Sequence, residues 1–102
     1  MTQFPKAQPI IDEKLLASYH GAACEECLFN FKGNRAHHFV RRSHLRLDIP
    51  ENLCVLCFDC HRRIHDGDQD LEKKLLKRRS KEDLAVLRGH APHSGLWKLL
   101  ED

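Results

Sequence analysis

The sequence predicts a single small α+β domain held together by bound metal. Two short apolar runs, residues 36–40 and 53–56, have the length and composition of strands. Around them, apolar residues recur at helical spacing. The chain has only 102 residues and carries two Cys-x-x-Cys pairs. A domain of this size buries a modest core and often needs a metal or a disulfide to stabilise it.

The N-terminal part is expected to be an arm followed by a helix. Residues 1–9 are polar and contain two prolines, so we interpret them as a loose arm. Residues 10–19 are predicted to be helical because Ile11, Leu15 and Tyr19 share one helical face, and Gly21 is expected to end that helix. Residues 24–27 then form a tight knuckle.

The predicted second strand leads into a helix. A basic loop, residues 41–51, connects the two strands. After the second strand, a helix is expected to begin at Asp59 or Cys60, and Gly67 closes it.

Residues 68–102 are predicted to form a helical extension to the core, which spans about residues 22–67. Leu71, Leu75 and Leu76 make one apolar stripe. A capping-box pattern at residues 80–83 predicts a helix over residues 81–88, with Gly89 as its stop. Residues 96–100 are expected to form a last helical turn whose tryptophan packs on the core.

Composition limits the cellular setting. The N-terminus has no apolar segment of the kind that a secretory signal needs, and no apolar run approaches the roughly 20 residues of a membrane span. We therefore expect a cytoplasmic protein without membrane contact, in which thiols stay reduced. The odd number of cysteines, five, also fits poorly with a pure disulfide scaffold.

The two Cys-x-x-Cys pairs predict a structural zinc site formed by Cys24, Cys27, Cys57 and Cys60. Four thiolates in two knuckles suit tetrahedral zinc, and closed sites of this kind are structural. Two pairs of buried thiols or a redox dithiol are the alternatives, although a redox motif does not need two pairs. Cys54 could replace Cys60 in the second pair, but it lies in the apolar run, where a free cysteine behaves as a small hydrophobic residue.

Four histidines predict a second metal site. His61 and His65 are four residues apart on a predicted helix and therefore share one face. The neighbours His37 and His38 lie on a predicted strand and point to opposite faces. One can bind a divalent ion while the other faces an attacking water, which supplies the metal and the base that phosphodiester hydrolysis needs. A surface position on the helix is the alternative for His65.

The net charge of +2 says little about partners, but the distribution of charge says more. Residues 32–46 contain five cations and no carboxylate, a pattern that suits a phosphate backbone. Four arginines of this stretch are candidate nucleic-acid contacts: Arg35, Arg41, Arg42 and Arg46. A solvated loop is an equally good interpretation of Arg41 and Arg42, and the basic run at residues 73–79 more often marks a solvated helix face than a DNA contact.

Taken together, these motifs resemble the HNH endonuclease family, which has the ββα-metal (His-Me finger) fold. The resemblance rests on Ala36-His37-His38-Phe39-Val40, on Asn52-Leu53, on Leu56-Cys57-x-x-Cys60-His61 and on His65. His38 and Asn52 are 14 residues apart, and Asn52 and His61 are 9 apart. The resemblance covers about residues 22–67, and the cysteine knuckles match the zinc-bearing branch of the family.

The resemblance implies a role for each matching residue. His38 is the expected general base, and Asn52 is expected to hold the loop and thereby His38. His37 and His61 are the expected ligands of a catalytic divalent ion, with His65 as a third ligand or a phosphate contact. His37 replaces the frequent aspartate of the family, which shifts the expected ion from Mg²⁺ or Mn²⁺ towards softer transition metals.

The expected function is metal-dependent cleavage of nucleic acid, most simply double-stranded DNA. Phosphate contacts give affinity without base readout, so we expect low intrinsic sequence specificity, with nicking or double-strand cleavage, or a protein partner that supplies specificity. The alternative functions are a non-catalytic HNH-like zinc module that binds nucleic acid and a structural zinc scaffold for a protein partner. An intact set of His37, His38, Asn52 and His61 favours the enzyme, because a binding module does not need it.

Overall fold

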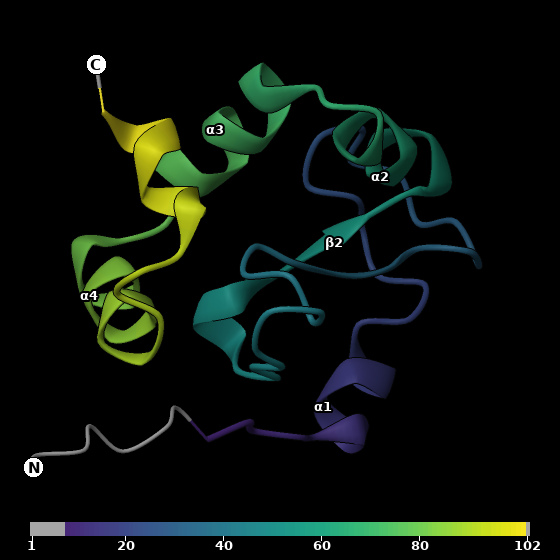
Figure 1. Ribbon diagram of the computed structural model, residues 1–102. Coiled ribbons are helices and arrows are strands. Elements are labelled where there is room, and N and C mark those ends of the chain that lie inside the picture. The colour runs from purple at the N-terminus through teal and green to yellow at the C-terminus, as the bar shows by residue number, and fades with distance from the viewer. Residues whose placement is uncertain (1–7, 102) are drawn as a thin grey trace, which may run out of the picture.

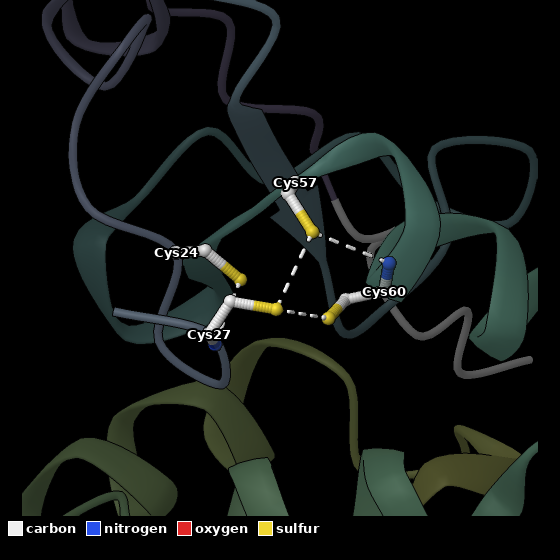
Figure 2. A group of neighbouring side chains, drawn as sticks. All are labelled: Cys24, Cys27, Cys57 and Cys60. Carbon is white, nitrogen blue, oxygen red and sulfur yellow. Dashed lines mark hydrogen bonds between the residues drawn. The ribbon is translucent and has the colours of Figure 1, made fainter. Parts of the chain in front are cut away.

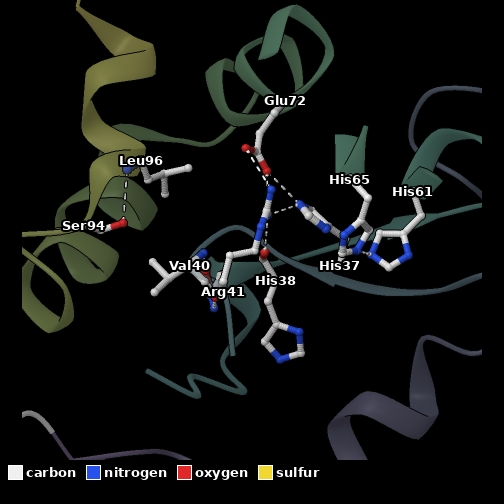
Figure 3. Close-up of polar contacts among 10 residues, drawn as sticks. His37, His38, Val40, Arg41, His61, His65, Glu72, Ser94 and Leu96 are labelled. Atoms are coloured by element: carbon white, nitrogen blue, oxygen red, sulfur yellow. Dashed lines mark hydrogen bonds and ion pairs between the residues drawn. The ribbon is translucent and has the colours of Figure 1, made fainter. Parts of the chain in front are cut away.

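The computed structural model describes residues 8–101, so most of the expected N-terminal arm lies outside the described residues. The fold is α+β, as predicted, and its centre is a strand–strand–helix unit. Strand β1 (Arg35–His38) pairs antiparallel with β2 (Leu53–Leu56), and helix α2 (Phe58–His65) follows directly. The unit brings both histidines of β1 and both histidines of α2 into one region of the molecule (Figure 3).

The sheet is short, and its register places the site. His37 pairs with Cys54 and His38 pairs with Leu53. The second strand has the predicted bounds, whereas the first begins one residue earlier and ends two residues earlier than the predicted 36–40. Beyond His38, the N–H groups of Phe39 and Val40 donate to Asn52 in the loop rather than to β2. This exchange of partners ends the strand next to the histidine doublet.

The N-terminal helix α1 (Glu13–Ser18) is shorter than the predicted 10–19. Its Asp12 cap accepts a hydrogen bond from the N–H of Leu15, which is the usual way that a helix begins. Ile10 is not helical, because it forms a parallel bridge with Leu47 and exchanges backbone hydrogen bonds with residues 46 and 48. Gly21, with a φ of +75°, follows the helix as expected.

Helix α2 begins at Phe58, one residue before the earlier of the two predicted starts. The Cys57 sulfur accepts from the N–H of Cys60 at 3.5 Å and so caps the helix. The helix ends at His65, and Gly67, at a φ of +98°, lets the chain turn away.

The C-terminal extension consists of α3 (Gln69–Lys77), α4 (Lys81–His90) and the 3₁₀ helix η2 (Gly95–Leu100). These elements gather on one side of β2, while α2 and α1 lie towards the other side (Figure 1). The extension fills much of the core with buried side chains: Leu71, Leu75, Leu76, Leu87, Leu96 and Trp97. The tryptophan therefore packs on the core as predicted, and its Nε1–H donates to the carbonyl of Ala91.

One C-terminal expectation needs correction. Helix α4 runs through Gly89 and ends at His90. Pro92 accounts for that ending, because the residue before a proline is disfavoured in the helical region, and Ala91 has left it with φ −136° and ψ 62°. The last segment, predicted as a helical turn at 96–100, is a 3₁₀ helix that begins one residue earlier, at Gly95. Ser80 caps α4 through the N–H of Asp83, as predicted.

Among the described residues, we find no helix long and apolar enough to cross a membrane.

Candidate metal and active site

The four predicted zinc ligands converge. The sulfurs of Cys24, Cys27, Cys57 and Cys60 all lie within 4.8 Å of one another (Figure 2). The Cys27 sulfur is 3.7 Å from that of Cys57 and 3.4 Å from that of Cys60. With Zn–S bonds of about 2.3 Å, tetrahedral sulfurs stand roughly 3.8 Å apart, so the arrangement fits zinc. Cys54 is buried in β2 and lies outside this group, which supports the predicted pairing.

The pKa values of these thiols also fit a bound cation. Burial raises the pKa of Cys24, but backbone N–H groups of Cys27, Cys57 and Glu26 outweigh burial and lower the pKa to about 7. Burial and the neighbouring thiols raise the pKa of Cys60. Without a cation, neighbouring thiolates repel one another, so the four thiols cannot all lose their protons. A bound divalent ion stabilises all four thiolates.

The first knuckle is tied by polar contacts to helix α3 and to the two residues that follow it. Glu26 receives Lys74 at 2.9 Å, and Glu25 receives Arg79. Arg78 donates to the backbone carbonyl of Glu25 at 2.8 Å. These cations belong to the basic run at residues 73–79, so part of that run pairs with the knuckle.

Three histidines lie together on the other side of α2. The Nε2 atoms of His61 and His65 are 3.2 Å apart, and the rings of His37 and His61 are 5.3 Å apart between centroids. Figure 3 shows these three rings side by side. Ligand nitrogens at about 2.1 Å from a tetrahedral ion stand roughly 3.4 Å apart, so the helical pair has a suitable separation. Within residues 8–101, however, only the four cysteines form a group of three or more side chains whose ligand atoms all lie within 4.8 Å of one another. The ligand nitrogens of the three histidines do not meet this criterion.

The electrostatics favour the neutral form of His37 and His61. Burial, together with the charges of His37 and His65, lowers the pKa of His61 to about 4. Burial also lowers the pKa of His37, against the opposing pull of Glu72. Neutral imidazole is the form that binds metal, so these rings are available as ligands at neutral pH.

Glu72 on α3 orients His37. The buried Glu72 accepts from His37 Nε2 at 2.9 Å and from Arg41 Nη1 at 2.8 Å. Burial raises the pKa of Glu72, but these two hydrogen bonds outweigh it and lower the pKa, so the carboxylate is ionised and acts only as an acceptor. Nε2 of His37 also lies 3.1 Å from Nη1 of Arg41. When Nε2 carries the ring proton and donates it to Glu72, Nδ1 is the nitrogen left for a metal. A carboxylate on the far nitrogen is the usual support of a metal-binding histidine.

His38 points away from this group, as the strand alternation predicts (Figure 3). Its Nε2 is 2.8 Å from Oδ1 of Asp48 in the loop. Both side chains are buried, with 8% and 0% of their surfaces exposed. Burial raises the pKa of Asp48, but hydrogen bonds from Arg46, His38 and the Asp12 N–H outweigh it and lower the pKa to about 2.

Asn52 holds the loop between the strands. It is fully buried at the end of the 3₁₀ helix η1 (Pro50–Asn52). Its Oδ1 accepts from the N–H of Val40 at 2.7 Å, and its Nδ2 donates to the carbonyls of Leu47 at 3.0 Å and Val40 at 3.3 Å. One side chain thus joins Val40 to Leu47, the residue directly before Asp48.

A cavity of about 450 Å³ opens over the histidines. Five histidines and three arginines line it together with Leu16, Ala36 and Ser43: His20, His37, His38, His61, His65, Arg35, Arg41 and Arg42. No carboxylate is among these lining residues, so the cavity suits an anion. His20, in the turn after α1, is exposed and also lines the cavity.

The four candidate phosphate-binding arginines have different surroundings. Arg35 donates to backbone carbonyls, and Arg42 is exposed at the cavity. Arg41 lines the cavity but pairs with Glu72, and Arg46 pairs with Asp48 at 2.9 Å away from the lining.

Sequence reasoning missed Glu72 and Asp48. Each carried a signal, because each carboxylate interrupts an apolar pattern. Glu72 is three and four residues before Leu75 and Leu76 and so shares their buried face. Asp48 stands between Leu47 and Ile49. A buried carboxylate needs partners, and histidines are suitable ones.

Comparison with known proteins points to one family. The model of the HNH endonuclease family matches residues 24–67, the segment that contains both cysteine knuckles, both strands and α2. No curated protein and no solved structure gives a significant match. HNH domains have nuclease-type functions on nucleic acids, and the four gathered cysteines fit a zinc-binding variant. Residues 24–67 of this chain are therefore similar to the HNH endonuclease family.

Proposed function

We propose that the chain, as one domain, is a metal-dependent endonuclease that hydrolyses phosphodiester bonds of DNA. The cavity carries this proposal: it places five histidines and three arginines, with no carboxylate in its lining, over the HNH motif. A phosphodiester is an anion, so this lining favours its approach.

In this proposal His37, His61 and His65 hold the catalytic ion. The 3.2 Å separation of the two helical nitrogens and the carboxylate support of His37 fit that role. Imidazole ligands suit softer transition metals such as Ni²⁺ better than Mg²⁺ or Mn²⁺. The bound ion supplies stabilisation of the charge that develops on the phosphate and on the leaving oxygen.

His38 acts as the general base, and Asn52 holds the loop beside it. The doublet geometry supports the separation of roles, because His38 is directed away from the other three histidines. Arg35 and Arg42 contact phosphates. Arg41 serves His37 through Glu72, and Arg46 serves Asp48, so these two stabilise the site in place of direct DNA contact.

The DNA is double-stranded in this proposal, and the cut has low intrinsic sequence specificity. Base readout requires side chains on the base edges in a groove, and phosphate contacts alone do not supply it. A protein partner is then the source of any sequence preference.

The test is cleavage of supercoiled plasmid in Mg²⁺, Mn²⁺, Ni²⁺ or EDTA. We expect relaxed and then linear DNA with a divalent ion, no change in EDTA, and loss of cutting in His38→Ala. His90→Ala is the matched control, because His90 is exposed at the end of α4 and lies outside the cavity lining. Equal cutting by wild type and His38→Ala refutes the role of the base. DNA binding in a gel-shift assay without cutting by wild type supports the non-catalytic zinc module instead.

A further inference from the structure

Asp48 is a buried carboxylate with a partner on each oxygen, and it lies beside the proposed general base. Its Oδ2 accepts from the N–H of Asp12 at 2.9 Å and from Arg46 Nε at 3.0 Å and Nη2 at 2.9 Å. Its Oδ1 faces Nε2 of His38 at 2.8 Å. The side chain is 0% exposed. All partners of Oδ2 are donors, and an ionised carboxylate only accepts, so Nε2 of His38 carries the ring proton.

The backbone of Asp48 is held from both sides. The N–H of Asp48 donates to the carbonyl of Ile10 at 2.8 Å, and the N–H of Ile10 donates to the carbonyl of Arg46 at 2.8 Å. From the other side, Asn52 donates to the carbonyl of Leu47. Segment 46–48 is therefore fixed between the N-terminal strand-like residues and the Asn52 side chain, so its carboxylate cannot easily follow a change in the histidine ring.

We propose that Asp48 is a positioning residue for His38, which keeps the ring proton on Nε2 and leaves Nδ1 as the atom that accepts a proton during cleavage. This inference rests on the proposed function, in which His38 is the base. When a water O–H bond breaks, the proton goes to Nδ1 and the oxygen bonds to phosphorus. The bond from phosphorus to the leaving oxygen breaks, and that oxygen keeps the electron pair and takes a proton from solvent. The imidazolium that forms is then stabilised by the Asp48 carboxylate.

The competing explanation is a buried pair that only stabilises the fold. The two explanations differ in the effect of Asp48→Asn. Three N–H groups point at the Oδ2 position, so the amide oxygen of Asn must take that place and the amide NH₂ must face His38. A donor there forces Nε2 to accept, and the proton moves to Nδ1. The base is then blocked although the packing is kept.

The first measurement is the tautomer of His38, read from long-range ¹H–¹⁵N correlation spectra of zinc-loaded, histidine-labelled protein. We expect the Nε2–H tautomer in wild type and the Nδ1–H tautomer in Asp48→Asn. Asp68→Asn is the matched control: Asp68 caps α3 and pairs with Arg63, so this variant should leave the His38 spectrum unchanged. An Nδ1–H tautomer in wild type overturns the inference. This outcome is measured on wild type alone, so it does not depend on whether a variant folds.

The second measurement is plasmid cleavage by the same three proteins. A histidine in the wrong tautomer costs on the order of 10³-fold or more in kcat, so we expect such a loss in Asp48→Asn with a KM for DNA within about twofold of wild type. Asp48→Asn that shows Nδ1–H and still cuts at the wild-type rate overturns the inference. A third outcome separates the two proposals: wild type has the Nε2–H tautomer, Asp48→Asn changes it, and neither protein cuts DNA. In that case the proposed nuclease function fails, and Asp48 only sets the tautomer of His38.

Discussion

Replacing Asn52 by alanine tests the part of the site that depends most on one side chain. Asn52 is 0% exposed and makes three hydrogen bonds, all to backbone atoms of residues 40 and 47. Alanine leaves the N–H of Val40 and the carbonyl of Leu47 without these partners in a place that water does not reach. Leu47 directly precedes Asp48, so the loss should also loosen the support of His38.

The expected cost follows from the geometry of the bonds. The bonds at 2.7 and 3.0 Å are well formed, and each contributes about 1–1.5 kcal/mol net. The bond at 3.3 Å contributes less. We therefore expect Asn52→Ala to lower the free energy of unfolding by about 3 kcal/mol. That is a large fraction of the roughly 5–15 kcal/mol that stabilises a domain.

Urea unfolding of the zinc-loaded protein, followed by circular dichroism, measures this cost. Asn30→Ala is the control, because Asn30 is exposed and makes a single 3.2 Å bond to the carbonyl of Gly21. The control should lose less than about 0.5 kcal/mol, as surface substitutions usually do. If Asn52→Ala loses less than 1 kcal/mol, or no more than the control, the loop is held by something other than Asn52.

Two further predictions concern the metal ligands. Cys57→Ser should lower the zinc content from one ion per chain, measured by atomic emission, and lower the thermal midpoint, measured by circular dichroism with and without a chelator. Cys54→Ser should retain its zinc, because Cys54 lies outside the cluster. Zinc loss in Cys54→Ser alone would contradict the ligand set. The second prediction uses the pKa of His61, which falls from 6.5 to about 4 on folding. Between these values the unfolded chain binds a proton that the folded chain does not, so folding stability should fall as pH drops from about 6.5 towards 4. His61→Gln should show a smaller fall than wild type in urea midpoints at pH 7 and pH 5, and parallel pH profiles would contradict it.

Local patterns in the sequence predicted most of the secondary structure and the gathering of the four cysteines. The bounds of β2 and the cap of α4 at Ser80 follow from short-range preferences that tertiary contacts did not override. The zinc cluster was predictable because the spacing of two knuckles almost determines that their sulfurs can meet.

The missed features depend on contacts between residues far apart in the chain. Periodicity alone extended the first helix back to Ile10, but a bridge to Leu47 takes that residue out of it. Glu72 meets His37 across 35 positions, and such a contact has no local signature beyond a carboxylate on an apolar face. The ion pairs of Arg41 with Glu72 and of Arg46 with Asp48 were not predictable either, because composition shows that a cation is present and not which carboxylate lies beside it.

The attachment of α3 to the rest of the molecule has a consequence for transplanting this domain. The family model ends at residue 67, yet Glu72 beside His37 and Lys74 beside Glu26 come from helix α3, and Arg79 beside Glu25 follows that helix. A graft of residues 24–67 into another protein would bring all the cysteines and histidines of the motif and leave behind the carboxylate bonded to His37. Leu75 and Leu76, both 0% exposed, would be missing from its interior. The smallest portable unit of this nuclease-type site therefore extends through α3.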